Sequence, residues 1–446
     1  MTPEKREVFD EIIVKMRAGR MSRRTFIERA TVIGLSVTAA GSLLDACGGS
    51  GGSSGGTTAI VWTSENDTTG TYAKMADTYN KTNKDKVHVT WENGPTSTDQ
   101  FLTKYTNMLR ARSHSTDVMS IDVVYPAEFA SNGWTAQLDS LWPTSARTNY
   151  LQGPIQACTY NGHIWAVPFR TDLGIIYYRT DLIKTPPSTW AEMTSMAQAQ
   201  MSSGKTKYGY VWQGAQYEGL VCDFNEVIHG YGGDVLDPSN PKNVIVNSAE
   251  GQAALTEMVS WVGSISPTAV TTYMEDDARK VWQNGDSAFM RNWPYAIVLG
   301  NDTTQSKIAG KFDIHSMLYG GSNTTGHSTT GGWNLAINAF TPNVNAAWSF
   351  MSYMLGPVAQ KEAAIGASWT PTLNSVYSDP DVLKAVPYFA KLAPILQNAL
   401  PRPVSPQYPD LSAAIQLRLH QALLKQSSVS DALSGLESDL KTLVNR

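Results

Sequence analysis

The sequence predicts an α/β fold with two lobes, and three observations support this prediction. The chain has 446 residues, which is more than one small hydrophobic core can organise. Its hydrophobic content of 42% and its charged content of 17% are those of a globular protein. In the first part of the globular region, strand-type and helix-type apolar patterns alternate along the chain. This order is typical of a parallel sheet that helices cover.

Three strands and three helices are expected in order along residues 59–133. The strand residues are mainly apolar or alternate with polar residues, whereas the helices repeat apolar residues every three or four positions. Pro126 suits the first turn of a helix, because that position needs no backbone N–H donor, and the helix ends before Gly133. The expected strands are 59–63, 87–91 and 117–123, and the expected helices are about 71–82, about 99–113 and the short one at Pro126.

The C-terminal part is expected to be helical from residue 341 onward. Trp348, Met351 and Leu355 share one face of a helix there, because they are three and four positions apart. A proline-rich loop, ALPRPVSPQYP, follows the next helical run and contains an arginine and a tyrosine. The further helical runs are about 379–399, 410–425 and 429–444.

The first sixty residues are expected to target the protein for export and not to form part of the globular fold. Residues 22–27, SRRTFI, form a twin-arginine export signature, and the apolar run 30–44 is too short and too polar to span a membrane. This run ends in LLDAC, which resembles a lipoprotein processing box with Cys47 as the lipidated residue. A stretch of only Gly and Ser follows. We therefore expect a signal region at 1–47, a flexible tether at 48–57 and a protein anchored by lipid outside the cytoplasm.

Cys158 and Cys222 are the cysteines that remain for the globular region. In an exported protein two cysteines could form a disulfide, but a single pair does not make a disulfide framework. Their spacing is compatible with a disulfide and with two free thiols, so both alternatives stay open.

The search for catalytic and metal-binding motifs finds no convincing set. The seven histidines never have metal-ligand spacing, and HExxH and CxxC are absent. The acidic triplet 275–277 could supply carboxylates for glycoside hydrolysis, although such a run more often begins a helix. With a net charge of −4, the chain has no basic excess that would favour nucleic acid. We therefore expect no catalytic residues, no metal, no cofactor and no nucleic-acid partner.

Aromatic and carboxylate residues at strand ends and in loops favour a sugar-binding site. Sugars present hydroxyl groups at their rims and C–H groups on their faces, so a sugar site combines carboxylates and arginine with flat rings. Glu65 and Asp122 are expected at the carboxyl ends of parallel strands, where ligands bind. In MRNWPYA, residues 290–296, polar residues precede Trp293 and Pro294 interrupts the following backbone. This pattern favours a ring platform over core packing.

Three stretches of the sequence are specific in combination. They are VWQGAQYEGLVCDF at the start of 211–233, RNWPYA at 291–296 and GGWNLAIN at 331–338. Together with the lipoprotein signal, they resemble the extracellular solute-binding proteins of sugar ABC importers, family 1, and within that family the trehalose/maltose-binding branch. The resemblance covers about residues 59–444.

This resemblance implies a type II periplasmic-binding-protein fold, in which two α/β lobes joined by crossover segments close around a ligand by hinge bending. The crossovers would lie near 167–169, 309–310 and 338–342. The implied N-terminal lobe is 58–168 with 311–338, and the implied C-terminal lobe is 169–310 with 339–446.

The resemblance also implies a set of ligand-binding residues. Carboxylates would accept hydroxyl protons, Trp293 would stack on a sugar ring, and Arg402 would fork onto hydroxyl groups. The full set is Glu65, Asp122, Arg170, Asp172, Glu275, Trp293, Tyr295, Gly331, Gly332, Trp333, Arg402 and Tyr408.

Structural alternatives exist for several residues of these motifs. Arg402 could instead cap the carboxyl end of a helix. Trp212 and Tyr217 are expected in the core, and Glu218 and Glu226 fit a structural role as well as a binding role.

The function expected from this resemblance is that of a monomeric, lipid-anchored receptor. It would capture a glucose disaccharide, trehalose first and maltose second, and deliver it to the transmembrane subunits of an ABC importer. One alternative is the same scaffold with another solute, such as an oligosaccharide or a glycerophosphodiester. The other alternative is a secreted glycoside-active enzyme.

Overall fold

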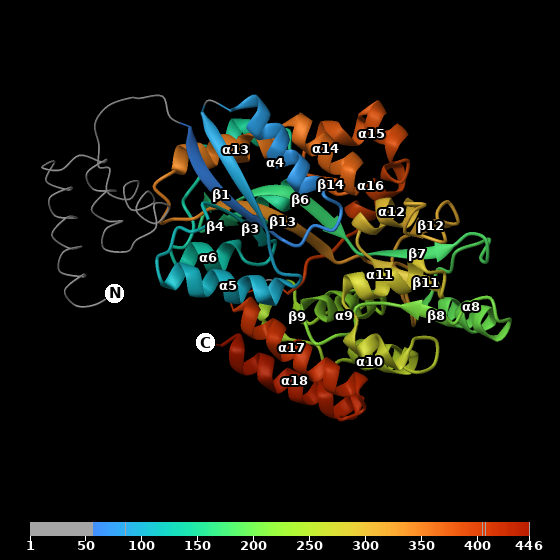
Figure 1. Cartoon of the computed structure of the whole chain (residues 1–446). Helices are drawn as coiled ribbons and strands as arrows, with labels where there is room; N and C mark the ends of the chain where they lie inside the picture. The colour runs from blue at the N-terminus through green and yellow to red at the C-terminus, as the bar shows by residue number, and fades with distance from the viewer. Residues whose placement is uncertain (1–56, 85, 404, 406, 446) are drawn as a thin grey trace, which may run out of the picture. The chain divides into compact units, whose positions relative to one another are not determined.

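The structure, a computed structural model, describes residues 57–84, 86–403, 405 and 407–445. These residues belong to one compact unit that begins at Thr57 (Figure 1). The predicted signal region 1–47 with its lipidation site Cys47, and all of the predicted tether except Thr57, lie outside the described residues.

A six-stranded sheet forms the core of what we name the first lobe. The strand order is β14-β6-β13-β3-β1-β2, and β1 runs parallel to both β2 and β3. The three strands and three helices predicted for residues 59–133 are all present, and so is the parallel arrangement. The strands are β1 (Thr58–Ser64), β2 (Val87–Asn93), β3 (Val118–Asp122), β6 (Val167–Leu173), β13 (Thr330–Ile337) and β14 (Thr370–Pro371). The helices are α4 (Thr71–Thr82), α5 (Thr98–Arg110), α6 (Pro126–Ser131), α7 (Gln152–Ala157), α13 (Val344–Leu355) and α14 (Pro357–Ala367).

A four-stranded sheet, ordered β12-β7-β11-β8, forms the core of the second lobe. Alternate residues of β7 enter different apolar clusters, since Ile176 and Tyr178 face one cluster and Ile175 and Tyr177 face the other. This sheet is therefore covered on both faces. The strands are β7 (Ile175–Arg179), β8 (Tyr208–Val211), β11 (Ser287–Asn292) and β12 (Phe312–His315). The helices are α8 (Trp190–Ser202), α9 (Glu218–Gly230), α10 (Ala249–Trp261), α11 (Glu275–Gln283), α12 (Tyr295–Asn301), α15 (Pro380–Ala385), α16 (Phe389–Gln397), α17 (Tyr408–Leu423) and α18 (Val429–Leu443).

Short elements that belong to neither of the two main sheets complete the described chain. They are the two-stranded pairs β4 (Thr159–Tyr160) with β5 (His163–Ile164) and β9 (Leu236–Asp237) with β10 (Asn240–Val244), and the 3₁₀ turns η1 (Thr144–Ala146), η2 (Thr268–Thr272) and η3 (Asn374–Ser378).

Helix α9 is unusual because every one of its residues is buried, including Glu218, Asp223 and Glu226. A helix that is buried all round has to find partners for each polar side chain, since water cannot supply them. Helices α10 and α17 pack against it, and α18 packs against both of those helices (Figure 1). The last two helical runs predicted from the sequence thus complete the second lobe, whereas α13 and α14, at the start of the predicted helical region, belong to the first.

The chain passes between the two sheets at places that differ from the predicted crossovers. The first passage is Gly174, between β6 and β7, whereas residues 167–169 lie inside β6. The second lies between β12 and β13, because β12 pairs with β7, and the third follows β14. The implied boundaries at 311 and 339 therefore do not coincide with sheet membership. Strand patterns in a sequence reveal a strand but not the sheet that it joins.

Gly174 shows why the first passage occurs where it does. A Cβ atom at this position would lie 1.8 Å from Glu226 Oε1 and 2.5 Å from Arg291 Nη2. Only glycine lets the backbone run this close to a buried ion pair. Any other side chain at position 174 would therefore collide with residues of the second lobe.

Cys158 and Cys222 are both buried and free, so the disulfide alternative is not formed. Cys158 lies in the core of the first lobe, and Cys222 lies on α9 in the second lobe. Within the described part of the chain, no helix has both the length and the apolar character needed to cross a membrane.

Candidate functional site

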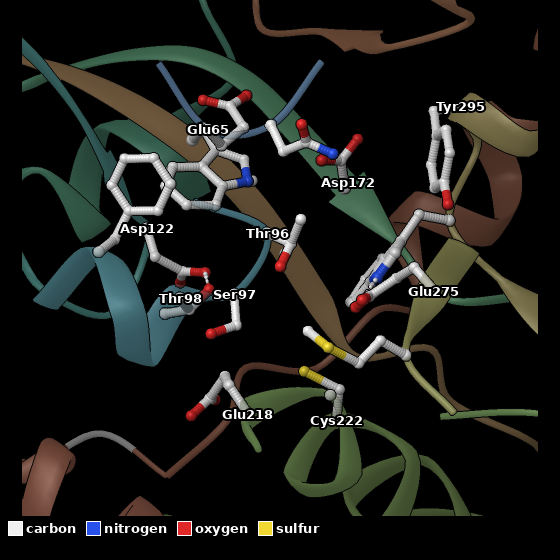
Figure 2. Close-up of a pocket in the computed structure, with 18 of the residues that line it drawn as sticks. Glu65, Thr96, Ser97, Thr98, Asp122, Asp172, Glu218, Cys222, Glu275 and Tyr295 are labelled. Atoms are coloured by element: carbon white, nitrogen blue, oxygen red, sulfur yellow. Dashed lines mark hydrogen bonds between the residues drawn. The ribbon is translucent and has the colours of Figure 1, made fainter. Parts of the chain in front are cut away.

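One pocket collects side chains from both lobes (Figure 2). Figure 2 shows Glu65 and Asp122 on one side of it and Glu275 and Tyr295 on the opposite side. Eleven of the twelve predicted binding residues line this pocket, and Tyr408 is the exception. The eleven are Glu65, Asp122, Arg170, Asp172, Glu275, Trp293, Tyr295, Gly331, Gly332, Trp333 and Arg402.

Strand register brings the first-lobe members together. Glu65 follows β1 directly and Asp122 is the last residue of β3, as the sequence predicts. On β13, Trp333 lies opposite Asp122 of β3 on one side and opposite Arg170 of β6 on the other. Three neighbouring strands therefore place a carboxylate, a ring and a guanidinium at one level of the sheet.

Arg170 lies between two carboxylates of the pocket wall. Its Nε and Nη2 donate to Glu65 Oε1 at 3.2 and 2.9 Å, and its Nη1 donates to Asp172. The phenol of Tyr72 also donates to Glu65. The guanidinium lies 4.7 Å from the centre of the Trp369 ring, which supports it from the other direction.

The two carboxylates beside Arg170 each retain an oxygen without a protein partner. Glu65 Oε2 and Asp172 Oδ1 are buried, and neither has a hydrogen-bond partner among the described residues. Burial raises the pKa of both carboxyls, while the positive charge of Arg170 opposes this rise. A buried acceptor without a partner costs free energy, so a ligand hydroxyl would stabilise this arrangement.

Trp293 forms part of the opposite wall and is half-buried rather than in the core. Its Nε1 donates to Glu275 Oε1 at 3.3 Å, which fixes one edge of the ring. The guanidinium of Arg291 lies 4.0 Å from the ring centre. Gly331 allows the close approach of β13, because a Cβ there would lie 2.9 Å from Trp293 Cζ3.

Arg291 is itself held by a buried ionic cluster beneath Trp293. Its Nε and Nη2 donate to the two carboxylate oxygens of Glu226 at 2.8 and 2.6 Å, and Asp223 lies 3.0 Å away. Gln213 accepts from Nη1 at 3.0 Å. Glu226, for which the sequence allowed a structural or a binding role, thus supports the ring from behind and does not line the pocket.

Two further rings lie along the walls. Trp333 is half-buried and packs edge-on against Phe101 of α5, with 5.2 Å between the ring centres. Tyr295, the first residue of α12, donates its hydroxyl to Asp276 at 3.0 Å. Gly332 has φ +135°, and a Cβ there would lie 2.5 Å from the carbonyl oxygen of Arg170. Glycine is required at this position for both reasons.

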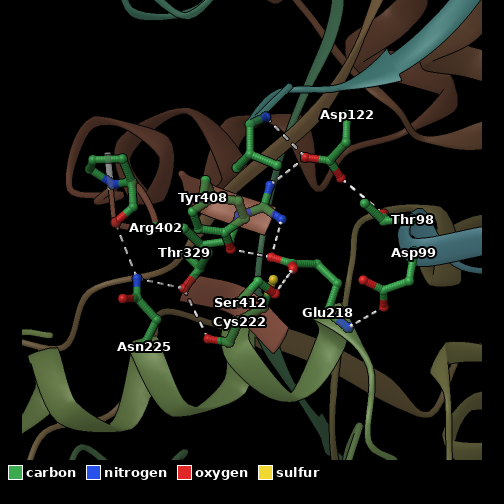
Figure 3. Close-up of polar contacts among 12 residues, drawn as sticks. Thr98, Asp99, Asp122, Glu218, Cys222, Asn225, Thr329, Arg402, Tyr408 and Ser412 are labelled. Atoms are coloured by element: carbon green, nitrogen blue, oxygen red, sulfur yellow. Dashed lines mark hydrogen bonds and ion pairs between the residues drawn. The ribbon is translucent and has the colours of Figure 1, made fainter. Parts of the chain in front are cut away.

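Arg402 joins the two lobes (Figure 3). Its Nη2 donates to Asp122 Oδ1 and its Nη1 donates to Glu218 Oε1, both at 2.7 Å. Tyr408 and Ser412 of α17 also donate to the Glu218 carboxylate. Tyr408 is therefore a buried support for Glu218 and does not line the pocket, whereas the resemblance implied that it contacts the ligand. No helix-capping role is needed to explain Arg402.

Several pocket residues were missed by the sequence analysis. Tyr217 is buried, as expected, but it also lines the pocket. Glu218, for which the sequence allowed a structural or a binding role, lines the pocket as the first residue of α9. The loops 66–69 and 95–98 follow β1 and β2, so the rule that ligands bind beyond strand ends could have found them. No sequence pattern indicated that Trp369, which precedes β14, would line the pocket.

The pocket offers rings, carboxylates and guanidiniums, which suits recognition of a polyhydroxylated ligand. No group of three or more His, Cys, Asp or Glu side chains in the described residues could hold a metal ion. The acidic triplet 275–277 begins helix α11, as its structural alternative proposed, and Glu275 also faces the pocket.

Comparison with known proteins identifies the family. The family model for bacterial extracellular solute-binding proteins matches residues 62–361. A Deinococcus radiodurans protein described as a probable ABC transporter-binding protein is 38% identical over 366 residues, which are 79% of this chain and 86% of that protein.

Solved structures agree with this match. The maltose-bound structure of T. maritima MalE3 superposes with a TM-score of 0.82 at 36% identity, covering 86% of this chain and all of that one. The GacH receptor of Streptomyces glaucescens, solved unliganded and with acarbose, shares the fold with a TM-score of 0.78 at 24% identity, covering 87% of this chain and 99% of that one. The chain therefore belongs to the bacterial extracellular solute-binding proteins, the two-lobed substrate-binding components of ABC sugar importers.

Proposed function

We propose that this protein is a lipid-anchored receptor that captures a glucose disaccharide, trehalose or else maltose, and delivers it to the transmembrane subunits of its importer. The observation that carries the proposal is the pocket between the lobes, with half-buried Trp293 and Trp333 and the unpartnered oxygens of Glu65 and Asp172. The similarity to the maltose-bound MalE3 structure supports a disaccharide of glucose as the ligand class.

The chemistry of the walls suggests how a disaccharide would lie. The C–H face of one sugar ring would stack on Trp293, where Arg291 supports the ring from behind. Rim hydroxyls would donate to Glu65 Oε2 and Asp172 Oδ1, which lack protein partners. A sugar isomer that leaves these buried acceptors unpaired would bind more weakly, so the same groups would supply specificity.

Binding would be coupled to the positions of the two lobes. The pocket wall is built from both lobes, so a ligand that contacts both favours the arrangement in which they meet. Direct contacts also connect them, such as the backbone N–H of Glu218 donating to Asp99 Oδ2 at 3.1 Å. The transmembrane subunits would recognise this closed arrangement.

The expected affinity is that of a reversible receptor. A disaccharide has about 23 non-hydrogen atoms, and at roughly 0.3 kcal/mol for each atom the binding free energy is about 7 kcal/mol. This corresponds to a Kd in the micromolar range. A sugar bound with a micromolar Kd can also be released to the transporter.

A tryptophan-fluorescence titration with trehalose, maltose and sucrose tests the proposal. We expect a saturable change with trehalose or maltose, and a much weaker affinity in Trp293→Ala. No response to any of the sugars would contradict the disaccharide assignment. Undiminished binding by Trp293→Ala would remove the ring from the site while leaving the receptor function intact.

The enzymatic alternative has a separate test. The protein would be incubated with trehalose and with maltose at saturating concentration, and free glucose would be measured over hours. We expect none above a control without protein. Glucose release that disappears in Glu275→Gln would replace the receptor by a glycoside-active enzyme.

A further inference from the structure

The wall of the pocket carries more negative than positive charge. Seven of its described lining residues are Asp or Glu, whereas Arg170 and Arg402 are the Arg or Lys residues among them. Each arginine already serves two carboxylates, so a surplus of negative charge remains. An anionic ligand such as a phosphate ester would add to this surplus, and a neutral sugar would leave it unchanged.

Most of the remaining acidic groups have their own partners. Asp276 forms an ion pair with Arg279 at 2.9 Å, so its charge is compensated outside the pocket. Asp67 accepts backbone N–H bonds from Thr69 and Tyr72, at 2.7 and 2.8 Å, and thereby stabilises the start of α4.

Glu275 differs from all of these carboxylates. Among the described residues it forms no ion pair with Lys or Arg. Its side-chain partners are neutral donors, the indole N–H of Trp293 at 3.3 Å and the phenol of Tyr217. Arg291 attracts it only from behind the Trp293 ring and is already bound by Asp223 and Glu226. Glu275 therefore has neither a Lys or Arg partner, as Asp276 and the carboxylates beside Arg170 and Arg402 have, nor the backbone N–H donors from other residues that Asp67 has.

The position of Glu275 puts this charge within reach of a ligand. The residue begins α11, and its carboxylate accepts a hydrogen bond from the indole N–H of Trp293. A substituent on the rim of a sugar stacked on that ring would point toward this edge. Burial raises the pKa of the Glu275 carboxyl, because the protein interior disfavours its negative charge.

We propose that the pocket binds saccharides that carry a protonated amino group in preference to their neutral parents, with Glu275 as the counter-ion. The proposal rests on the disaccharide-receptor function above and specifies its substrate class further. An ammonium in place of a rim hydroxyl donates a charge-assisted hydrogen bond and neutralises a charge that hydration no longer stabilises. The same surplus disfavours sugar phosphates and glycerophosphodiesters.

Calorimetric titration of the full chain tests this preference. The ligands are trehalose and maltose, a panel of their monoamino-deoxy isomers with one hydroxyl replaced by an amine, and the N-acetyl form of each isomer. We expect at least one amino isomer to bind with a Kd about 10-fold lower than that of its parent sugar. N-acetylation should abolish the gain, because it removes the charge and keeps the position.

Two variants connect the preference to Glu275. In Glu275→Gln the ratio of the Kd values of the parent sugar and the best amino isomer should fall to about 1, because the amide carries no charge. Asp277→Asn removes one negative charge from the same helical turn at an exposed residue outside the pocket wall. Its ratio of the two Kd values should equal that of the natural protein. It therefore controls for the loss of one negative charge near the pocket.

The outcomes are distinguishable from failure of the proposed function. If the neutral disaccharide binds and every amino isomer binds equally or more weakly, the preference for basic saccharides is wrong and the receptor function stands. A gain that persists in Glu275→Gln also overturns the proposal. If neither neutral nor amino sugars bind, the disaccharide function itself fails and the proposal fails with it.

Discussion

Arg170 and Arg402 are each held between two carboxylates of the pocket wall, but the two clusters join different parts of the molecule. Arg170 and its partners, Glu65 and Asp172, all lie in the first lobe. Arg402 instead joins Asp122 of the first lobe to Glu218 of the second. The first cluster therefore shapes one wall of the pocket, whereas the second connects both walls.

The clusters also differ in how well their oxygens are satisfied. In the Arg402 cluster, Thr98 donates to Asp122 Oδ2 at 3.1 Å, and Tyr408 and Ser412 donate to the two oxygens of Glu218. In the Arg170 cluster, one oxygen of each carboxylate has no described partner. Identical residue types thus form, around Arg402, a clamp in which every carboxylate oxygen has a partner and, around Arg170, a cluster in which two carboxylate oxygens have none.

Replacing the clamp arginine should have the largest effect. Arg402→Met leaves Asp122 and Glu218 buried without their cation and removes an ionic link between the lobes, so we expect a loss of about 3–5 kcal/mol in the free energy of unfolding. Urea denaturation measures it. Arg170→Met is the matched comparison and should lose less stability, because its partners all belong to one lobe. Equal losses would mean that the contrast between the clusters has no energetic basis.

Removing an unsatisfied acceptor should change binding more than stability. We expect Asp172→Asn to weaken disaccharide binding by about 10- to 100-fold, because a charged acceptor of a ligand hydroxyl is lost. Calorimetry gives the affinity, and thermal unfolding without sugar gives the stability. A large fall in Tm with unchanged affinity would show that Asp172 stabilises the fold and does not contribute to recognition of the sugar.

A smaller effect is expected where the two lobes meet at the Trp293 platform. In Gly331→Ala the new methyl group would lie 2.9 Å from the ring, so the ring has to shift. Loss of good stacking should raise the Kd by up to about 10-fold. Gly153→Ala in α7 is the control, since a Cβ there meets no neighbour within 4 Å. Unchanged affinity in Gly331→Ala would show that the ring position is not critical.

The smallest effect concerns Glu128 of α6, whose carboxyl pKa is raised to about 7 by burial and by repulsion from Asp410 of α17. Because this pKa is higher in the folded than in the unfolded state, the stability it contributes is complete below about 4.5 and is lost as the pH rises through about 7. Glu128→Gln stays neutral. The Tm of the variant minus the Tm of the natural protein should therefore increase as the pH rises from 5 to 8. A constant difference across this range would contradict the raised pKa.

The local elements were largely predictable from the sequence. The parallel strands β1, β2 and β3 follow from apolar periodicity, and the start of α6 follows from Pro126. Glu65 and Asp122 were found at strand ends because parallel strands present their carboxyl ends at one edge. The proposed lipid anchor at Cys47 comes from the sequence motif alone.

The partners of these residues could not be predicted in the same way. The sequence predicted Arg402 and Tyr408 as two ligand contacts. In the structure both donate to the same carboxylate, Glu218, and Arg402 alone also lines the pocket. Glu218 is 184 residues from Arg402 along the chain. Only packing of α17 against α9 brings them together, and no local pattern encodes that contact.

The sequence by itself determined the elements, the family and most of the residue types of the pocket, because these depend on periodicity, turn residues and short motifs. The tertiary structure decided which sheet each strand joins, where the chain crosses between lobes, and which carboxylate oxygens are left without a partner. These properties depend on distances between residues far apart in the chain. Arg170 and Arg402 are the same residue type and had the same predicted role. They differ in role only because the fold gives them different neighbours.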